Sequence, residues 1–153
     1  MSHPSQPPKL LPGHHLKALR LPVFLREYEK VASQCATDKV PHDTFLLRLS
    51  ELELLERERK GTQRRVKQAE FPANKSMDNF DFSAVPSLNK KQTLELARCE
   101  WIDKRENLIF IGNPDCGKTH LAIALGIGAC QKGYKVRFMT AAGLINALVE
   151  APR

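Results

Sequence analysis

Residues 112–119 read Gly-Asn-Pro-Asp-Cys-Gly-Lys-Thr, and this stretch limits the possible folds more than any other part of the sequence. It matches the pattern G-x-x-x-x-G-K-[ST] at every fixed position. It follows the apolar run Asn107–Ile111, which is typical of a buried parallel strand, and it precedes a helical pattern over residues 118–131. A glycine-rich loop between a strand and a helix is the usual setting for a phosphate-binding site, and an ordinary turn containing glycine is the alternative.

The residue types in this stretch suit a polyphosphate ligand. Glycine lets backbone N–H groups approach the phosphates closely, and the start of the following helix adds a partial positive charge. Lys118 is expected to reach the β- and γ-phosphates, and the hydroxyl of Thr119 to bind Mg²⁺. His120 either contacts a phosphate or packs against the protein. We therefore predict an ATP and Mg²⁺ site made by Gly112, Asn113, Pro114, Asp115, Cys116, Gly117, Lys118, Thr119 and His120.

The sequence after the helix repeats the strand-then-helix order. Gly133 is expected to end the helix, Lys135–Met139 to form a second strand, and Thr140 to cap a helix over 141–150. The predicted fold class is therefore α/β. It has an N-terminal α-helical domain followed by an incomplete parallel-sheet core of the phosphate-loop NTPase type.

Residues before position 71 show helical periodicity. Apolar residues recur from Pro22 to Cys35, and a second helix is expected to start at Asp43 as its cap. A leucine-rich stripe follows in this second helix, and we expect it to form the core of the domain: Phe45, Leu46, Leu47, Leu49, Leu52, Leu54 and Leu55. The predicted organisation is a flexible tail (1–15), a helical domain (16–70), a linker (71–88) and a partial ATPase domain (89–153).

The chain has a formal net charge of +7, and most of the excess lies in its first half. Lysine and arginine neutralise nucleic-acid phosphates without reading sequence. The DNA-contact candidates form one run: Arg57, Arg59, Lys60, Arg64, Arg65 and Lys67. A solvated helix face is the alternative for this run, and Gly61 and Thr62 are expected to weaken or bend the helix there.

Three further features bear on the site and the compartment. Phe80 and Phe82 flank Asp81 in the linker, and they either pass near the adenine or anchor the linker to the core. The cysteines at 35, 99, 116 and 130 fit neither a zinc site nor a disulfide framework, and we expect Cys116 to be reactive. Because no apolar run approaches the roughly 20 residues of a membrane span and no signal pattern is present, we expect a cytoplasmic protein with no membrane partner.

The stretch from Gly112 to Phe138 resembles the IstB family of transposition helper ATPases, together with FDFSAVPSLNK and LLRLSELELLERERK upstream. The resemblance covers residues 20–150 and extends to the DnaC helicase loaders. It implies an AAA+-type protein that binds ATP and target DNA, acts with the transposase of the same insertion sequence, and assembles into oligomers. A helicase loader and a non-catalytic module that binds DNA or a transposase remain as alternatives.

The sequence departs from the family pattern in two ways. Asn113, Asp115 and Cys116 replace the usual proline, glycine and threonine, and the carboxylate of Asp115 is expected to weaken ATP binding. No apolar strand ending in two acidic residues follows Met139, and the sensor and arginine-finger elements are also missing. Because phosphoryl transfer depends on such groups, we expect a truncated member with little or no hydrolysis.

Overall fold

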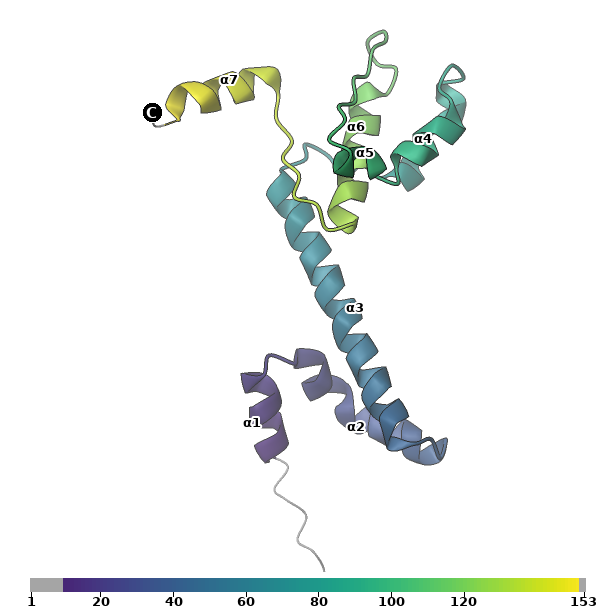
Figure 1. Cartoon of the computed structure of the whole chain (residues 1–153), viewed down its shortest axis with the longest axis vertical. Helices are drawn as coiled ribbons and strands as arrows, with labels where there is room; N and C mark the ends of the chain where they lie inside the picture. Colours follow the sequence, from purple (N-terminus) through teal and green to yellow (C-terminus); the bar gives the residue numbers. More distant parts are fainter. Residues whose placement is uncertain (1–9, 152–153) are drawn as a thin grey trace, which may run out of the picture. The chain divides into compact units, whose positions relative to one another are not determined.

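The computed structural model of the chain describes residues 10–151 (Figure 1). This part of the chain forms two compact units that meet between Lys60 and Gly61, and this boundary falls within one long helix. The tail predicted over 1–15 lies partly outside the described residues, and its last residues belong to the first helix. The helical elements are, in chain order, α1 (Leu10–Ala18), α2 (Pro22–Thr37), α3 (His42–Ala69), η1 (Met77–Asn79), η2 (Phe82–Ala84), α4 (Lys90–Leu96), α5 (Glu100–Asp103), α6 (Lys118–Gln131) and α7 (Ala141–Glu150).

The first unit has its core between α2 and the start of α3. Val31, Cys35 and Leu49 are buried together, and Phe24, Tyr28, Val40 and Phe45 pack against them. The leucine stripe contributes much less than predicted, since Leu46, Leu47, Leu54 and Leu55 are exposed and Leu52 is partly exposed. That prediction was wrong for these residues because α3 packs on α2 along one narrow face only.

The start of α2 depends on a side chain from α3. Leu21 precedes the helix and offers no side-chain cap. Glu53, whose exposed fraction is 4%, accepts hydrogen bonds from the backbone N–H groups of Val23 (2.9 Å) and Phe24 (3.4 Å). Its other carboxylate oxygen accepts from Arg57 Nε at 3.1 Å, an ion pair between residues four apart on α3. Glu53 therefore serves as the missing cap of α2.

Two local predictions for α3 were wrong. Asp43 lies inside the first turn, where its carboxylate accepts from the N–H of Thr44 at 2.8 Å, and it is not the capping residue. Gly61 and Thr62 do not interrupt the helix, which continues to Ala69. Arg65 Nη2 donates to Thr62 Oγ1 at 3.1 Å, so a side-chain contact within the helix spans this stretch. The helical hydrogen bonds and such contacts outweigh the roughly 1 kcal/mol cost of an interior glycine.

The second unit is built around α6. Most of its apolar residues are buried, including Ile123, Leu125 and Cys130. Phe71 lies against Gly126, where an added Cβ atom would be 2.8 Å from the ring, so only glycine allows this approach. Arg65 Nε donates to the carbonyl oxygen of Cys130 at 2.7 Å and thereby binds an acceptor at the C-terminal end of α6.

The predicted parallel sheet is not present, and the fold class is corrected accordingly. The described residues contain helices but no strand, and 107–111 and 135–139 are extended segments without a ladder partner. Along 107–111 the burial alternates: Leu108 and Phe110 pack on the core, whereas Ile109 and Ile111 are 81% and 92% exposed.

The hydrogen bonding of the second extended segment explains why the two do not pair. The N–H of Phe138 donates to the carbonyl oxygen of Ala69 at 2.8 Å, and Arg137 forms an ion pair with Glu70 at 2.6 Å. The segment therefore bonds to the end of α3 instead of to 107–111. A strand exists only through its neighbour, and an apolar run in the sequence does not reveal whether that neighbour is there.

The cap predicted at Thr140 is present, and α4 has a side-chain cap as well. Asn89 accepts from the N–H of Gln92 at 3.1 Å at the start of α4, and Thr140 accepts from the N–H of Gly143 at 3.1 Å at the start of α7. Gly133, with φ of +98°, follows the last turn of α6 as expected. Leu94 of α4 is exposed. No helix among residues 10–151 has the length and apolar character needed to cross a membrane.

Candidate functional site

The 112–117 loop leads directly into α6. Gly117 precedes the helix with φ of 82° and ψ of 8°, a left-handed conformation that favours glycine. Asp115 is also left-handed, with φ of 61°, a conformation that aspartate tolerates better than most residues. The tight return of the chain also requires Gly112, because a Cβ atom there would lie 3.0 Å from Cys116 Sγ.

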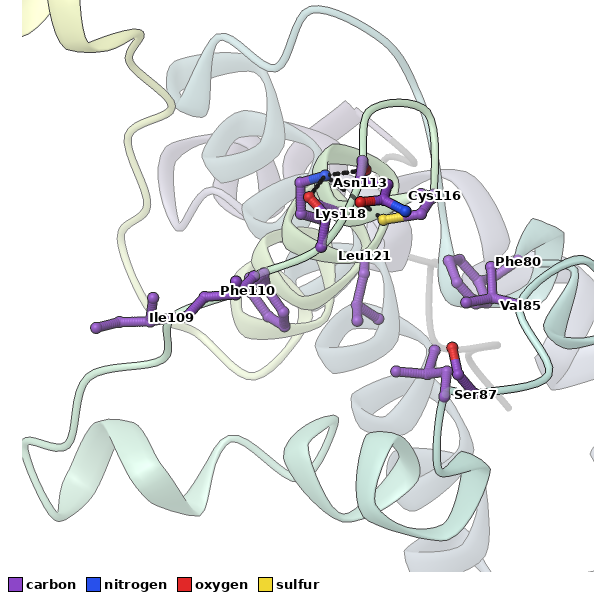
Figure 2. A pocket seen from close by; sticks show the side chains of 13 residues that line it. Phe80, Val85, Ser87, Ile109, Phe110, Asn113, Cys116, Lys118 and Leu121 are labelled. Carbon is purple, nitrogen blue, oxygen red and sulfur yellow. Dashed lines mark hydrogen bonds between the residues drawn. The ribbon is translucent and has the colours of Figure 1, made fainter.

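The side chain of Lys118, the first residue of α6, folds back onto the loop. Its ammonium group donates to the carbonyl oxygens of Gly112 at 2.9 Å and Asn113 at 2.5 Å. It also lies 3.5 Å from Cys116 Sγ. Figure 2 shows these contacts, with Lys118, Asn113 and Cys116 gathered where the loop turns into the helix. The positive charge is thus held inside the curve of the loop.

The start of α6 adds hydrogen-bond donors beside this charge. First-turn N–H groups of a helix have no partner within the helix, and they carry its partial positive charge. No side chain caps this end of α6. Thr119 is exposed in the same turn, and the exposed Asp115 is the acidic side chain of the loop itself.

A pocket of about 480 Å³ adjoins the loop. Phe80 and Val85 lie on one side of it and Ile109 and Phe110 on the other, as Figure 2 shows. The floor includes Leu121, and Gly112, Asn113, Cys116, Gly117 and Lys118 complete the lining at the loop. The arrangement combines one positive charge and a helix start with a cavity that has both apolar and polar walls, which suits a ligand that has an anionic part and a flat apolar part.

His120 packs against the segment that precedes α4. The centroids of its ring and the Phe80 ring are 5.1 Å apart, in an edge-to-face arrangement. Its Nε2 lies 3.3 Å from the carbonyl oxygen of Ser76. Of the two roles considered for His120, the packing contact is the one seen here. The ring centroids of Phe80 and Phe82 are also 4.9 Å apart. Because Phe80 belongs to the core cluster with Leu121 and Leu125, it anchors the linker to the core.

The basic run separates into paired and unpaired residues. Arg57 pairs with Glu53, while Arg59 and Lys60 both pair with Glu56, and Arg59 and Lys60 hold the pKa of that carboxyl down at about 2. Arg65 binds the end of α6, a role that the sequence analysis missed because its acceptor is a backbone carbonyl 65 residues away. Arg64 and Lys67 are exposed and form no ion pair with any residue that the structure describes.

The structure adds site residues that the motif does not contain. Val85, Leu88 and Leu121 line the pocket, and Ser76 contacts His120. Val85 and Leu88 follow the Phe80–Phe82 pair by a few residues, so apolar spacing in the linker was the available signal. Nothing in the sequence indicated Ser76, since its contact uses the backbone.

The residues present are compatible with Mg²⁺ bound together with a nucleotide. Magnesium in nucleotide sites takes most of its ligands from phosphates and water, and the exposed hydroxyl of Thr119 can supply one protein ligand beside them. No cluster of three or more histidine, cysteine, aspartate or glutamate side chains suited to a metal occurs within residues 10–151.

Comparison of the sequence with known proteins identifies a family. Residues 14–153 match the family described as IstB-like ATP binding protein. A relative from Geobacillus stearothermophilus, named as an ATP-binding protein of insertion sequence IS5376, is 39% identical over 133 residues, which are 87% of this chain and 53% of the relative. A relative from Pseudomonas aeruginosa, named for insertion sequence IS21, is 35% identical over 89% of this chain and 51% of its own length.

Similar coverage holds for a third relative. A protein from Mycobacterium tuberculosis, also named as ATP-binding and located in an insertion sequence, is 32% identical over 87% of this chain and 53% of its own length. The chain thus spans about half the length of the curated relatives it matches. The family match covers more than nine-tenths of the sequence, including the 112–117 loop and both flanking segments. The chain belongs to the IstB-like ATP-binding protein family.

Proposed function

We propose that this chain binds ATP with Mg²⁺ through the 112–117 loop and the start of α6, and that it serves as an ATP-binding helper in insertion-sequence transposition. The observation that carries the proposal is the position of Lys118. Its ammonium group lies inside the curve of the loop, at the N-terminal end of a helix and beside a pocket of about 480 Å³. A triphosphate fits such a combination of charge and N–H donors.

When the nucleotide binds, the ammonium group of Lys118 exchanges one set of hydrogen-bond acceptors for another. Without a ligand, the carbonyl oxygens of Gly112 and Asn113 accept the hydrogen bonds of Lys118. The β- and γ-phosphate oxygens carry more negative charge than carbonyl oxygens, and charge-assisted hydrogen bonds are about twice as strong as neutral ones. Lys118 therefore turns from the loop towards the phosphates, while Thr119 contributes its hydroxyl to Mg²⁺ and the pocket receives the nucleoside.

The role in transposition draws on the relatives. Those described above are named as ATP-binding proteins of insertion sequences, and this chain shares a third or more of its residues with the first two over most of its length. We propose the transposase of the same insertion sequence as a partner, and assembly of several copies of the chain.

A fluorescent ATP analogue tests the nucleotide site. We expect saturable binding that requires Mg²⁺ and that falls at least about tenfold in Lys118→Ala, since a charge-assisted contact is worth about 1.5–3 kcal/mol. Lys135→Ala is the matched control, because it removes an exposed lysine outside the loop. Equal binding by the two variants, or no binding by the wild type, would favour the alternative of a non-catalytic interaction module.

DNA contact is proposed for the part of the basic run that is free of ion pairs. Arg64 and Lys67 are exposed, whereas Arg59 and Lys60 are held by Glu56. Replacing Arg64 and Lys67 by alanine should weaken binding to duplex DNA and reduce its salt dependence by roughly 0.9 per lost phosphate contact. The Arg59→Ala, Lys60→Ala double variant removes the same charge and should have the smaller effect. An equal effect of both pairs would indicate only non-specific attraction.

A further inference from the structure

The segment before α4 reaches the base of the 112–117 loop through one aromatic side chain. Phe80 is 8% exposed and shares a core cluster with Leu121 and Leu125. A Cβ atom placed on Gly117 would lie 3.5 Å from Cε2 and 3.7 Å from Cζ of Phe80. The edge of the ring thus bounds the space beside Gly117, the residue that joins the loop to α6, at the distance where a side chain there would begin to touch it.

Gly117 is the point at which a small shift would matter most. Its left-handed backbone, with φ of 82°, sets the direction of the N–H groups that follow it at the start of α6. A glycine can leave this conformation at little cost, since it populates several others about equally well. The conformation must therefore be held by its surroundings. The carbonyl oxygen of Gly117 accepts from the N–H of Leu121 at 2.9 Å, and the ring of Phe80 and a methyl group of Val85 are the nearest side-chain atoms to the place that a Cβ of Gly117 would occupy.

Phe80 itself is fixed from several sides. Its N–H donates to the carbonyl oxygen of Met77 at 3.1 Å, and its ring meets those of Phe82 at 4.9 Å and His120 at 5.1 Å, both edge to face. The neighbouring Asp81 accepts from the N–H of Ser83 at 2.8 Å, which closes η2. A ring held in this way can hold the loop in turn, because its position is determined by packing and hydrogen bonds outside the loop.

We propose that Phe80 is a positioning residue for phosphate binding: its ring holds Gly117 in the left-handed conformation that directs the N–H groups of α6 at a polyphosphate. This inference depends on the proposed function and adds a part to it from outside the glycine-rich motif. It places the support of the loop in the 77–88 segment, and it assigns to Phe80 an effect on the phosphates in addition to its place in the lining of the pocket.

Inorganic tripolyphosphate distinguishes these two effects, because it has no base. We expect Phe80→Ala to weaken Mg²⁺-ATP and Mg²⁺-tripolyphosphate binding by similar factors of about tenfold, in line with the cost of misplacing binding groups by a fraction of an ångström. Phe80→Met, which refills much of the volume, should restore most of the affinity for both. A loss for ATP with unchanged tripolyphosphate binding would show contact with the base and overturn the proposal.

A second variant separates positioning from general loss of stability. Leu125 belongs to the same buried cluster as Phe80 and lies one turn of α6 beyond Leu121. Leu125→Ala should therefore destabilise the second unit about as much as Phe80→Ala does. At a temperature where both variants are folded, Leu125→Ala should keep the wild-type affinity for tripolyphosphate. The amide resonance of Gly117, in protein labelled with ¹⁵N-glycine, should move in Phe80→Ala and stay in place in Leu125→Ala.

The possible results are distinct. Equal weakening of tripolyphosphate binding by Phe80→Ala and Leu125→Ala, or an unmoved Gly117 resonance in Phe80→Ala, would overturn the positioning role while leaving the nucleotide site intact. Failure of the wild-type chain to bind either ligand would instead overturn the proposed function and this inference with it.

Discussion

The carboxylate of Glu53 accepts a hydrogen bond from the backbone N–H of Val23 at 2.9 Å, and both residues are buried. The bond joins α2 to α3 through two residues that lie 30 positions apart in the sequence. Because α2 has no cap of its own, this contact supplies the acceptor that its first turn lacks.

Replacing Glu53 by alanine should therefore destabilise the first unit. The buried N–H of Val23 would lose its partner and Arg57 its ion pair, and a buried unsatisfied donor costs about 1–3 kcal/mol. Glu53→Gln keeps an oxygen acceptor and should lose less. Urea unfolding followed by circular dichroism measures the change, and Glu51→Ala, on the exposed face of α3, is the control. The cap would be dispensable if Glu53→Ala and Glu51→Ala unfolded at the same urea concentration.

Two glycines of α6 should respond to alanine with opposite signs. At Gly126 the new methyl group would lie 2.8 Å from Phe71, and overpacking of this kind costs about 1–3 kcal/mol. At Gly128 nothing lies within 4 Å, so alanine should stabilise the helix by about 1 kcal/mol. Thermal unfolding of the two variants gives the comparison directly. A rise in the midpoint for Gly126→Ala would mean that Phe71 does not pack on this helix.

Asp115 should limit nucleotide affinity in two separable ways. Its left-handed backbone, with φ of 61°, is strained for any residue except glycine, and its carboxylate lies in a loop proposed to bind anions. Asp115→Asn removes the charge and keeps a side chain that tolerates this conformation, whereas Asp115→Gly removes both charge and strain. We expect affinity for Mg²⁺-ATP to increase in the order Asp, Asn, Gly, by several-fold overall. Equal affinities of all three proteins would exclude Asp115 as a determinant.

Cys116 should be the fastest cysteine to react with maleimide. Its thiol is partly exposed and 3.5 Å from the ammonium group of Lys118, whereas the other three cysteines are buried. Burial also raises the pKa of the Cys99 and Cys130 thiols, which lowers their reactive thiolate fraction at neutral pH. Bound Mg²⁺-ATP should slow labelling of Cys116 and leave the buried thiols unaffected. Identical labelling rates with and without nucleotide would place the ligand elsewhere.

The sequence predicted the helices and their ends well where the signal is local. The periodicity from Pro22 to Cys35 lies within α2, and the helices at 118–131 and 141–150 are present. These helices, the cap at Thr140 and the glycine at 133 follow from side chains and backbone needs within a few residues. The left-handed conformation of Asp115 was likewise foreseeable from its residue type.

The errors concern partners that lie far away in the sequence. The strands predicted at 107–111 and 135–139 have no ladder, because Phe138 bonds to Ala69 at the end of α3. Leu54 and Leu55 share the apolar character of Leu49 but face away from α2. The cap supplied by Glu53 and the contact of Arg65 with Cys130 depend on tertiary packing, which no local pattern encodes.

The central claim is that the loop around Lys118 binds a magnesium-bound triphosphate. Isothermal titration calorimetry of Mg²⁺-ATP into the folded chain tests it most directly, with Lys118→Ala measured alongside under the same conditions. The proposed site predicts a saturable heat for the wild-type chain and its loss, or a drop of at least about tenfold in affinity, in the variant. A folded wild-type sample that gives no heat of binding at several temperatures, or a variant that binds as tightly as the wild type, would contradict the account.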